Sequence, residues 1–151
     1  MGRIRGDILK SRRGSYKLAR SMNNPALTAF ISSKLLVSDT PVYSFLLKPS
    51  TGKTHQIRVS MKSIGSPILG DSRHSTTTAS RGYLHAAAMR FTLYGEDISI
   101  ICAPEEGDIF MSTAFRRQFH EEWFSDETVH SPVWFEDKSL LTSSLEEFGA
   151  I

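Results

Sequence analysis

The strongest constraint on the fold is a change of hydrophobic period at Pro49. Residues 26–37 and 42–48 are rich in β-branched and aromatic side chains, and residues 38–41 between them have the composition of a turn. Two such runs joined by a short turn predict an antiparallel pair of core strands. After Pro49 the apolar residues recur at helical spacing, which predicts a helix over residues 53–64 directly after the second strand.

The ends of this helix carry their own signals. Thr54 is expected to cap the N-terminus, and Gly65 falls where a C′ glycine would end the helix. Ile57, Met61 and Ile64 are spaced i, i+4 and i+7, so we expect them to form the buried stripe.

The remainder of the chain predicts a loop, a hairpin and a second helix. The Ser/Thr-rich residues 72–80 are typical of a mobile surface loop. Residues 83–94 and 98–103 predict two strands joined by a turn at residues 95–97. Apolar residues at four-residue spacing then predict an amphipathic helix over residues 111–124, with a stripe that we assign to core packing: Met111, Phe115, Phe119 and Trp123.

Charge is divided unevenly along the chain. Residues 1–62 hold twelve Lys or Arg and two Asp or Glu, whereas residues 63–151 hold six and fourteen. A basic half of this kind indicates a surface that faces a polyanion. Residues 1–24 mix basic residues with glycines, which predicts either a solvated loop or an arm whose Arg12 and Arg13 contact phosphates.

Composition narrows the class of protein. A chain of 151 residues is about one domain, which we place at residues 1–124, followed by an acidic and partly flexible tail over residues 125–151. The single Cys102 rules out an internal disulfide and favours a reducing cytoplasm. The sequence contains no apolar run near the roughly 20 residues of a membrane span, so we expect no membrane association.

The sequence lacks the motifs that several enzyme classes require. Gly52-Lys53-Thr54 resembles the end of a phosphate-binding loop, but Leu47 stands where that motif needs its first glycine. The five histidines and Cys102 have no zinc-ligand spacing, so we expect no metal and no cofactor.

Cationic residues gather at the start of the first helix. Lys53, His55 and Arg58 lie near its N-terminus, where the helix dipole favours anions, and Lys62 follows on the same side. This predicts an anion site. An alternative interpretation is structural: Thr54 only caps the helix, and Arg58 satisfies a carboxylate of the core.

Three ordered segments carry a family resemblance. They are Thr51-Gly52-Lys53-Thr54-His55-Gln56-Ile57-Arg58-Val59, then Gly65-Ser66-Pro67-Ile68-Leu69-Gly70-Asp71, then Arg81-Gly82-Tyr83-Leu84-His85-Ala86. Together they resemble the C-terminal motif region of the RluA family of pseudouridine synthases, over about residues 26–104. Lys53 and Ser60 replace an arginine and a histidine of the family pattern.

The resemblance implies both a fold and an activity. The fold would be α+β, a mixed and mostly antiparallel sheet with flanking helices, as in the C-terminal part of the synthase catalytic domain. The activity would be isomerisation of uridine to pseudouridine in ribosomal or transfer RNA, without metal or cofactor. Arg58 would pair with the catalytic aspartate, and Leu84 would lie against the flipped uracil with His85 beside it, although an ordinary core strand explains these two residues as well. Thr54, His55 and Gln56 would shape the pocket wall.

One departure from the family pattern concerns the chemistry itself. The family's nucleophilic aspartate lies in a His-Arg-Leu-Asp motif, and these 151 residues do not contain it. Tyr16 lies outside the context of the family's catalytic tyrosine. We therefore expect an N-terminally truncated and inactive form, in which Arg58 faces a solvent-open cleft, an ordered anion, or a substitute carboxylate such as Asp71.

Two other function classes remain open on sequence alone. The chain could be a non-catalytic RNA-binding module of the same fold, or a protein-interaction domain that uses its acidic tail. A shortened sheet would also leave an edge exposed, which favours a homodimer.

Overall fold

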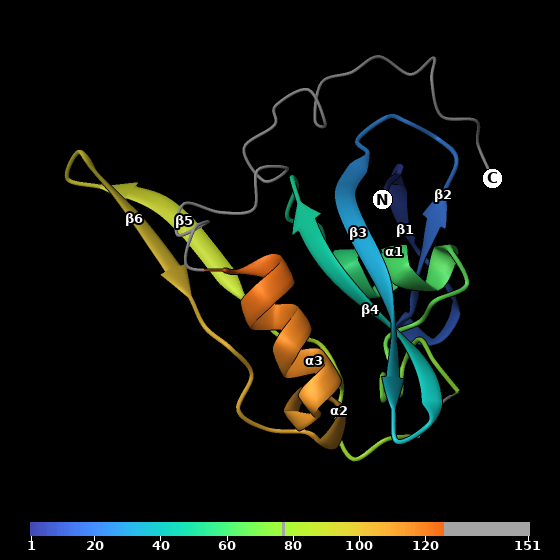
Figure 1. The fold of residues 1–151 in the computed structure, drawn as a ribbon. Coiled ribbons are helices and arrows are strands. Elements are labelled where there is room, and N and C mark those ends of the chain that lie inside the picture. Colours follow the sequence, from blue (N-terminus) through green and yellow to red (C-terminus); the bar gives the residue numbers. More distant parts are fainter. Residues whose placement is uncertain (77, 126–151) are drawn as a thin grey trace.

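The computed structural model describes residues 1–76 and 78–125 (Figure 1). The acidic tail expected at residues 125–151 lies outside the described residues from position 126 onward. Within the described part, the architecture is a four-stranded sheet, a separate two-stranded hairpin and a small set of helices, which confirms the expected α+β class. No helix in residues 1–76 and 78–125 has the length and apolar character needed to cross a membrane.

The main sheet is antiparallel throughout, with the strand order β2-β1-β3-β4. Its strands are β1 (Gly2–Lys10), β2 (Tyr16–Ala19), β3 (Ala26–Val37) and β4 (Thr40–Pro49). The pairing of β3 with β4 confirms the predicted hairpin. Ser38 and Asp39 form its turn with φ of 47° and 62°, the left-handed pair that suits the twist of a tight hairpin.

The expected N-terminal loop or arm was wrong, because residues 1–19 supply two strands. Gly6 permits this, since a Cβ at that position would lie 2.2 Å from the carbonyl oxygen of Ala19 on β2. Asp7 then closes the end of the hairpin, where its carboxylate accepts the backbone N–H groups of Asn23 and Asn24 at 3.0 and 2.8 Å. The glycines that suggested flexibility thus allow close strand packing.

Helix α1 (Gln56–Ser63) starts later than predicted and is capped differently. Its N-cap is His55, with φ of 55°, whereas Thr54 is exposed and makes no cap. The Gln56 side chain organises the turn instead: its Oε1 accepts the backbone N–H of Lys53 at 3.0 Å and the hydroxyl of Thr51 at 2.7 Å.

The buried face of α1 is also rotated from the predicted stripe. It consists of Gln56, Val59, Ser60 and Met61, whereas Ile64 is 41% exposed. The C-terminal end is as expected. Gly65 has φ of 76°, and the backbone N–H groups of residues 65 and 66 bond the carbonyls of residues 62 and 61, which completes a Schellman motif.

A second hairpin, β5 (Ala88–Leu93) with β6 (Glu96–Ile101), projects beside the main sheet (Figure 1). The first predicted strand was too long, because residues 83–87 are not a strand. One face of this hairpin is mostly apolar and largely exposed; we call it the apolar hairpin face, and it contains Met89, Phe91, Leu93, Ile98 and Ile100, with Glu96 opposite Leu93 at its end.

The C-terminal helix is broken into three segments: α2 (Asp108–Met111), α3 (Thr113–Arg117) and the π-helical η2 (Gln118–Trp123). Ser112 breaks the helix, because it is extended and its hydroxyl accepts the N–H of Phe115 at 3.3 Å. Phe115, Phe119 and Trp123 pack into the main core with Leu46 of β4, as predicted for the stripe. The assignment of Met111 to this buried stripe was wrong, because Met111 is 39% exposed and the neighbouring Phe110 is buried instead.

Candidate active site

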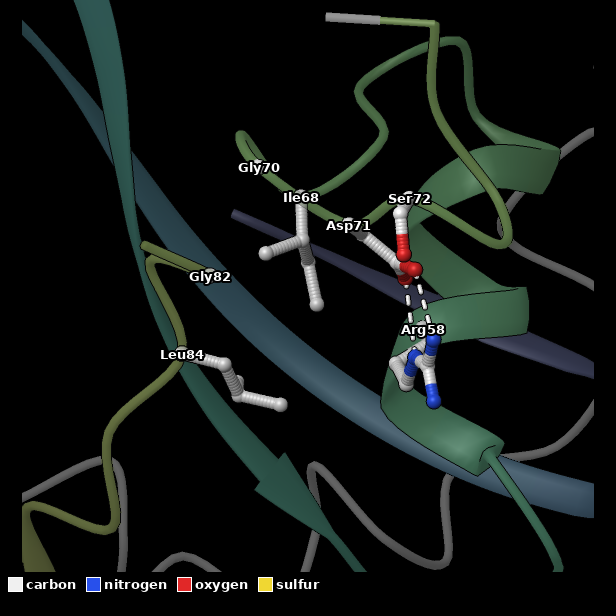
Figure 2. A pocket seen from close by; sticks show the side chains of 7 residues that line it. All are labelled: Arg58, Ile68, Gly70, Asp71, Ser72, Gly82 and Leu84. Atoms are coloured by element: carbon white, nitrogen blue, oxygen red, sulfur yellow. Dashed lines mark hydrogen bonds and ion pairs between the residues drawn. The ribbon is translucent and has the colours of Figure 1, made fainter. Parts of the chain in front are cut away.

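Arg58 and Asp71 form the centre of the site. Arg58 extends from the first turn of α1, and Asp71 lies in the irregular segment that follows the helix. The guanidinium Nε donates to Oδ2 of Asp71 at 2.8 Å, and Nη2 donates to Oδ1 at 2.6 Å (Figure 2). Of the three surroundings expected for Arg58, the structure therefore contains the substitute carboxylate.

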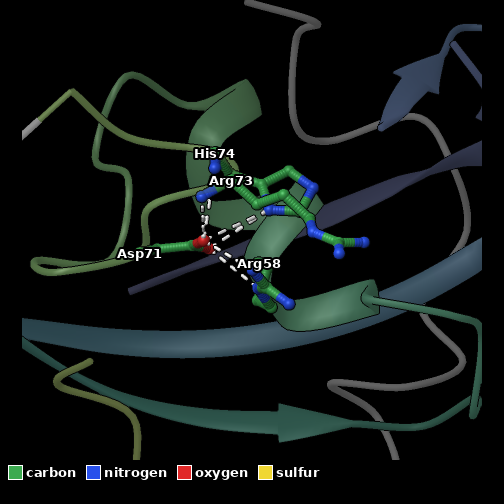
Figure 3. Close-up of polar contacts among 4 residues, drawn as sticks. All are labelled: Arg58, Asp71, Arg73 and His74. Carbon is green, nitrogen blue, oxygen red and sulfur yellow. Dashed lines mark hydrogen bonds and ion pairs between the residues drawn. The ribbon is translucent and has the colours of Figure 1, made fainter. Parts of the chain in front are cut away.

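Only the carboxylate of this ion pair is buried. The Asp71 side chain is 3% exposed and that of Arg58 is 30% exposed. The hydrogen bonds from Arg58 hold the pKa of the Asp71 carboxyl far below its ordinary value, and the same bonds raise the pKa of Arg58. The backbone N–H groups of Arg73 and His74 also donate to Oδ1, at 3.0 and 3.2 Å, so the carboxylate stays ionised (Figure 3).

A pocket of about 160 Å³ opens beside the pair (Figure 2). Its lining residues are Arg58, Ile68, Gly70, Asp71, Ser72, Gly82 and Leu84. Leu84 is 40% exposed, so the position expected to face a flipped base does present an apolar side chain at the pocket.

A close crossing of two segments shapes the wall of this pocket. A Cβ at Gly70, where φ is 74°, would lie 1.9 Å from the carbonyl oxygen of Arg81. The backbone N–H of Tyr83 donates to the carbonyl of Leu69 at 2.9 Å, which fixes the crossing. Only glycine fits here, and it brings Leu84 to the same pocket as Arg58.

Three aromatic rings extend the site toward the main sheet. His55 makes edge contacts with Tyr16 of β2 and with His74, at ring-centroid distances of 5.3 and 5.4 Å. Burial, together with the positive charge of Arg58, lowers the pKa of His55. Nδ1 of His55 and Nε2 of His74 are buried without a hydrogen-bond partner in the described part of the chain. His74 was expected in a mobile surface loop, and this was wrong because its ring is fully buried against Asp71.

The remaining residues predicted for substrate binding fall into two groups. Lys53, Thr54 and Lys62 surround α1; Lys62 and Thr54 are exposed, and Nζ of Lys53 donates to Oδ1 of Asn24 at 2.6 Å. Gln56 is buried, and its Nε2 donates to the carbonyl of Leu27 and the hydroxyl of Thr28 while Oε1 accepts two bonds. Its polar groups are thus used inside the fold, where they hold the turn that precedes α1.

The second group lies away from Arg58 in sequence. His85 does not lie in a strand, and its Nε2 is 2.8 Å from the carbonyl oxygen of Cys102. Arg12 is exposed in the short 3-10 turn η1 (Arg12–Gly14) between β1 and β2. Arg13 lies in the same turn, and its side chain is not described. Among the described residues, no group of three His, Cys, Asp or Glu side chains could hold a metal ion.

Sequence reasoning missed His74 as a part of the site. A signal was present, since His74 follows Asp71 by three residues, a spacing at which a side chain returns to a carboxylate within one turn. The surrounding serines and threonines concealed it, because their composition is typical of a solvated loop.

Over part of its length the chain is similar to known RNA pseudouridine synthases. An "Uncharacterized RNA pseudouridine synthase" of Haemophilus influenzae is 46% identical over 113 residues, which is 73% of this chain and 49% of the relative. The "Dual-specificity RNA pseudouridine synthase RluA" of Salmonella typhimurium is 33% identical over 93 residues, 58% of this chain and 42% of that protein. The chain spans about half the length of these curated relatives.

A solved structure and the family models complete the comparison. The structure titled "Human RNA Pseudouridylate Synthase Domain Containing 1" aligns with a TM-score of 0.58 and 26% identity, over 67% of this chain and 47% of the human chain. No family model matches the chain.

Proposed function

Over the part that it shares with these relatives the chain belongs to the RluA family of pseudouridine synthases, and we propose that it contributes to the isomerisation of uridine to pseudouridine in ribosomal or transfer RNA. The observation that carries this proposal is the Arg58–Asp71 pair at the mouth of the pocket that Leu84 also lines. The motif that contains Arg58 is the one in which the family places the partner of its catalytic aspartate.

The guanidinium of Arg58 has donors left over that could bind a second carboxylate. A guanidinium has five N–H donors in one plane, and Asp71 uses only Nε–H and one Nη2–H. The third nitrogen, Nη1, points away from Asp71 (Figure 2). The edge formed by Nη1 and Nη2 is therefore suited to an incoming aspartate, which it would hold ionised and aimed at the base or ribose.

The chemistry would follow the family scheme. The aspartate attacks the ribose or the base, the bond between N1 and C1′ breaks, and the uracil turns. C5 then bonds to C1′, the bond to the aspartate breaks and releases the carboxylate, and C5 loses its proton. The base must leave its stack first, which suits a pocket with an apolar side chain such as Leu84 on one side.

RNA would be bound along the basic half of the chain. We assign RNA contacts to side chains around the pocket and on the β1–β2 turn: Lys53, Thr54, His55, Lys62, Leu84, His85, Arg12 and Arg13. Gln56 would act indirectly, through the turn that it holds. Phosphate contacts of this kind predict an RNA affinity that falls steeply with salt.

The 151 residues alone should not catalyse, because they contain no His-Arg-Leu-Asp motif. We expect no tritium release above a no-enzyme control from RNA labelled with [5-³H]uridine. Turnover by this chain alone would refute the assignment of the nucleophile to an aspartate outside it.

A chimera tests the proposal directly. The matched residues of the Haemophilus influenzae relative are replaced by those of this chain, and tritium release is measured on ribosomal and transfer RNA transcripts. We expect activity within about tenfold of the intact relative, and an Arg58→Lys chimera at least about a hundredfold slower, because an ammonium cannot hold two carboxylates by paired planar bonds. An active chimera that tolerates Arg58→Lys would contradict the role of Arg58.

A non-catalytic RNA-binding module is the second candidate. The basic residues of positions 1–62 and the missing nucleophile motif favour it. This candidate predicts salt-dependent RNA binding by the chain and an inactive chimera, whereas a synthase predicts an active one.

Self-association is a further part of the proposal. The apolar hairpin face and the outer edges of β2 and β4 are the surfaces through which two copies could pair. A reducing cytoplasm, consistent with the exposed free Cys102, is the proposed location.

A further inference from the structure

His74 has a buried ring that carries one unused nitrogen. We propose that His74 is a positioning residue, whose Nδ1–H holds the Asp71 carboxylate in the orientation that presents both oxygens to Arg58. In this way His74 fixes the guanidinium edge that faces the pocket. The importance of that edge for catalysis rests on the proposed function; the positioning itself does not.

The contacts of the ring establish the direction of the hydrogen bond. Nδ1 of His74 lies 3.2 Å from Oδ2 and 3.4 Å from Oδ1 of Asp71, and the side chain of His74 is 0% exposed (Figure 3). Asp71 is ionised and can only accept, so Nδ1 must carry the proton. The ring also makes an edge contact with His55, which restricts its movement.

The protonation of the other nitrogen follows from its surroundings. Nε2 of His74 is buried and has no partner among the described residues. A bare lone pair there is less costly than an unpaired N–H, which would be a buried donor without an acceptor. The ring is therefore expected as the Nδ1–H tautomer.

An orphaned nitrogen is itself informative. A phenyl ring has a similar size and would fill the same volume without leaving a polar atom unpaired, so packing alone would favour phenylalanine at this position. What histidine adds is the donor toward Asp71. To supply that donor, the histidine leaves Nε2 without a partner in the part of the chain that the structure describes. This is expected where the orientation of a neighbouring carboxylate matters more than the stability of the fold.

Orientation is needed because Asp71 lies in an irregular segment. Its backbone is anchored by the N–H of Ser75, which donates to the Asp71 carbonyl at 2.8 Å. The carboxylate can still rotate about its own bond. The N–H groups of Arg73 and His74 both bond to Oδ1, whereas Nδ1 of His74 is close to both carboxylate oxygens, hydrogen-bonded to Oδ1 at 3.4 Å and 3.2 Å from Oδ2. Without that contact the carboxylate could turn about its own bond, and one of its two bonds to Arg58 would open.

Solvent exchange of the Arg58 Nε–H tests the inference in the complete 151-residue chain. In ¹⁵N-labelled protein we expect His74→Phe to speed this exchange by about tenfold, the effect of one hydrogen bond to a charged group. His74→Asn can place an N–H near the position of Nδ1, and it should restore the exchange to within about twofold of the original. Arg117, whose exposed Nε donates to Glu121 at 2.9 Å, is the internal control and should not change.

Two results would overturn the inference. If the exchange rate of the Arg58 Nε–H were unchanged in His74→Phe, His74 would not position the Asp71 carboxylate. If the rate were equally raised in His74→Asn and His74→Phe, His74 would serve only to pack the core. A measurement without any variant protects against misfolding: the ring ¹⁵N shifts of His74 should show a protonated Nδ1 and a bare Nε2, and the opposite tautomer would refute the proposal. None of these readouts needs RNA, so an inactive chimera would refute the proposed function and leave this inference standing.

Discussion

Replacing Asp71 by asparagine should destabilise the chain by about 2–3 kcal/mol. Two bonds to the Arg58 guanidinium are involved, at 2.8 and 2.6 Å. An asparagine oxygen can accept one of them, but its amide N–H₂ then faces a guanidinium donor, so the second bond is lost and a donor is left unpaired. Breaking a fully buried pair costs about 3–5 kcal/mol, and the 30% exposure of Arg58 lets water recover part of this.

The same variant has a defined pH signature. The pKa of Asp71 is lowered in the folded chain from its ordinary value of 3.8, so the pair contributes its full stability above that pH. As pH falls below 3.8 toward the folded pKa, the contribution is lost. The difference between the original chain and Asp71→Asn should therefore be constant from about pH 5 to 8 and shrink in stronger acid.

Urea unfolding followed by far-UV circular dichroism measures both effects. Glu121→Gln is the matched control, because it removes one carboxylate from an ion pair whose side chains are 73% and 64% exposed. Such a pair is worth at most about 0.5 kcal/mol. If Asp71→Asn were no more destabilising than Glu121→Gln, or if its effect persisted unchanged in acid, the account of the Arg58–Asp71 pair would be refuted.

Three further predictions follow from the fold. Gly70→Ala should prevent stable folding or lower the free energy of unfolding in urea by more than about 3 kcal/mol. The control Gly14→Ala, where φ is 71° and no atom lies within 4 Å, should lower it by only about 1–2 kcal/mol. Similar values for the two variants would mean that the crossing at Arg81 relaxes freely. Phe91→Asp should lower the apparent mass in sedimentation at high protein concentration without changing stability, and an unchanged mass would exclude the apolar hairpin face as the interface. Lys62→Gln should reduce the slope of log K against log salt for single-stranded RNA by about 0.7, and an unchanged slope would exclude a phosphate contact there.

Local signals in the sequence were sufficient for some of these elements. The β3–β4 hairpin and the end of α1 at Gly65 depend on backbone conformations that few residue types adopt, so their turn residues identified them. Arg58 was selected through its motif, and Asp71 through the need of a buried guanidinium for a carboxylate. In each case the local chemistry has few solutions.

Other features depend on contacts that are distant in sequence. Strand β1 was missed because Gly6 owes its role to Ala19, and basic residues around it mask the short alternation of the strand. The rotation of α1 follows from Gln56 bonding to Leu27, a partner 29 residues away. His74 is buried by His55, which the spacing of residues along the chain does not reveal.

The contrast between the β3–β4 hairpin and the pocket has a consequence for the order of folding. The hairpin registers ten residue pairs around a two-residue turn, so its contacts are local and can form early. The pocket exists only after Gly70 has crossed Arg81 and Asp71 has met Arg58, and these contacts close loops of irregular chain. We expect the pocket to be the first part to open in native-state hydrogen exchange and the last to form on refolding, so a substrate would act on the least protected part of the fold.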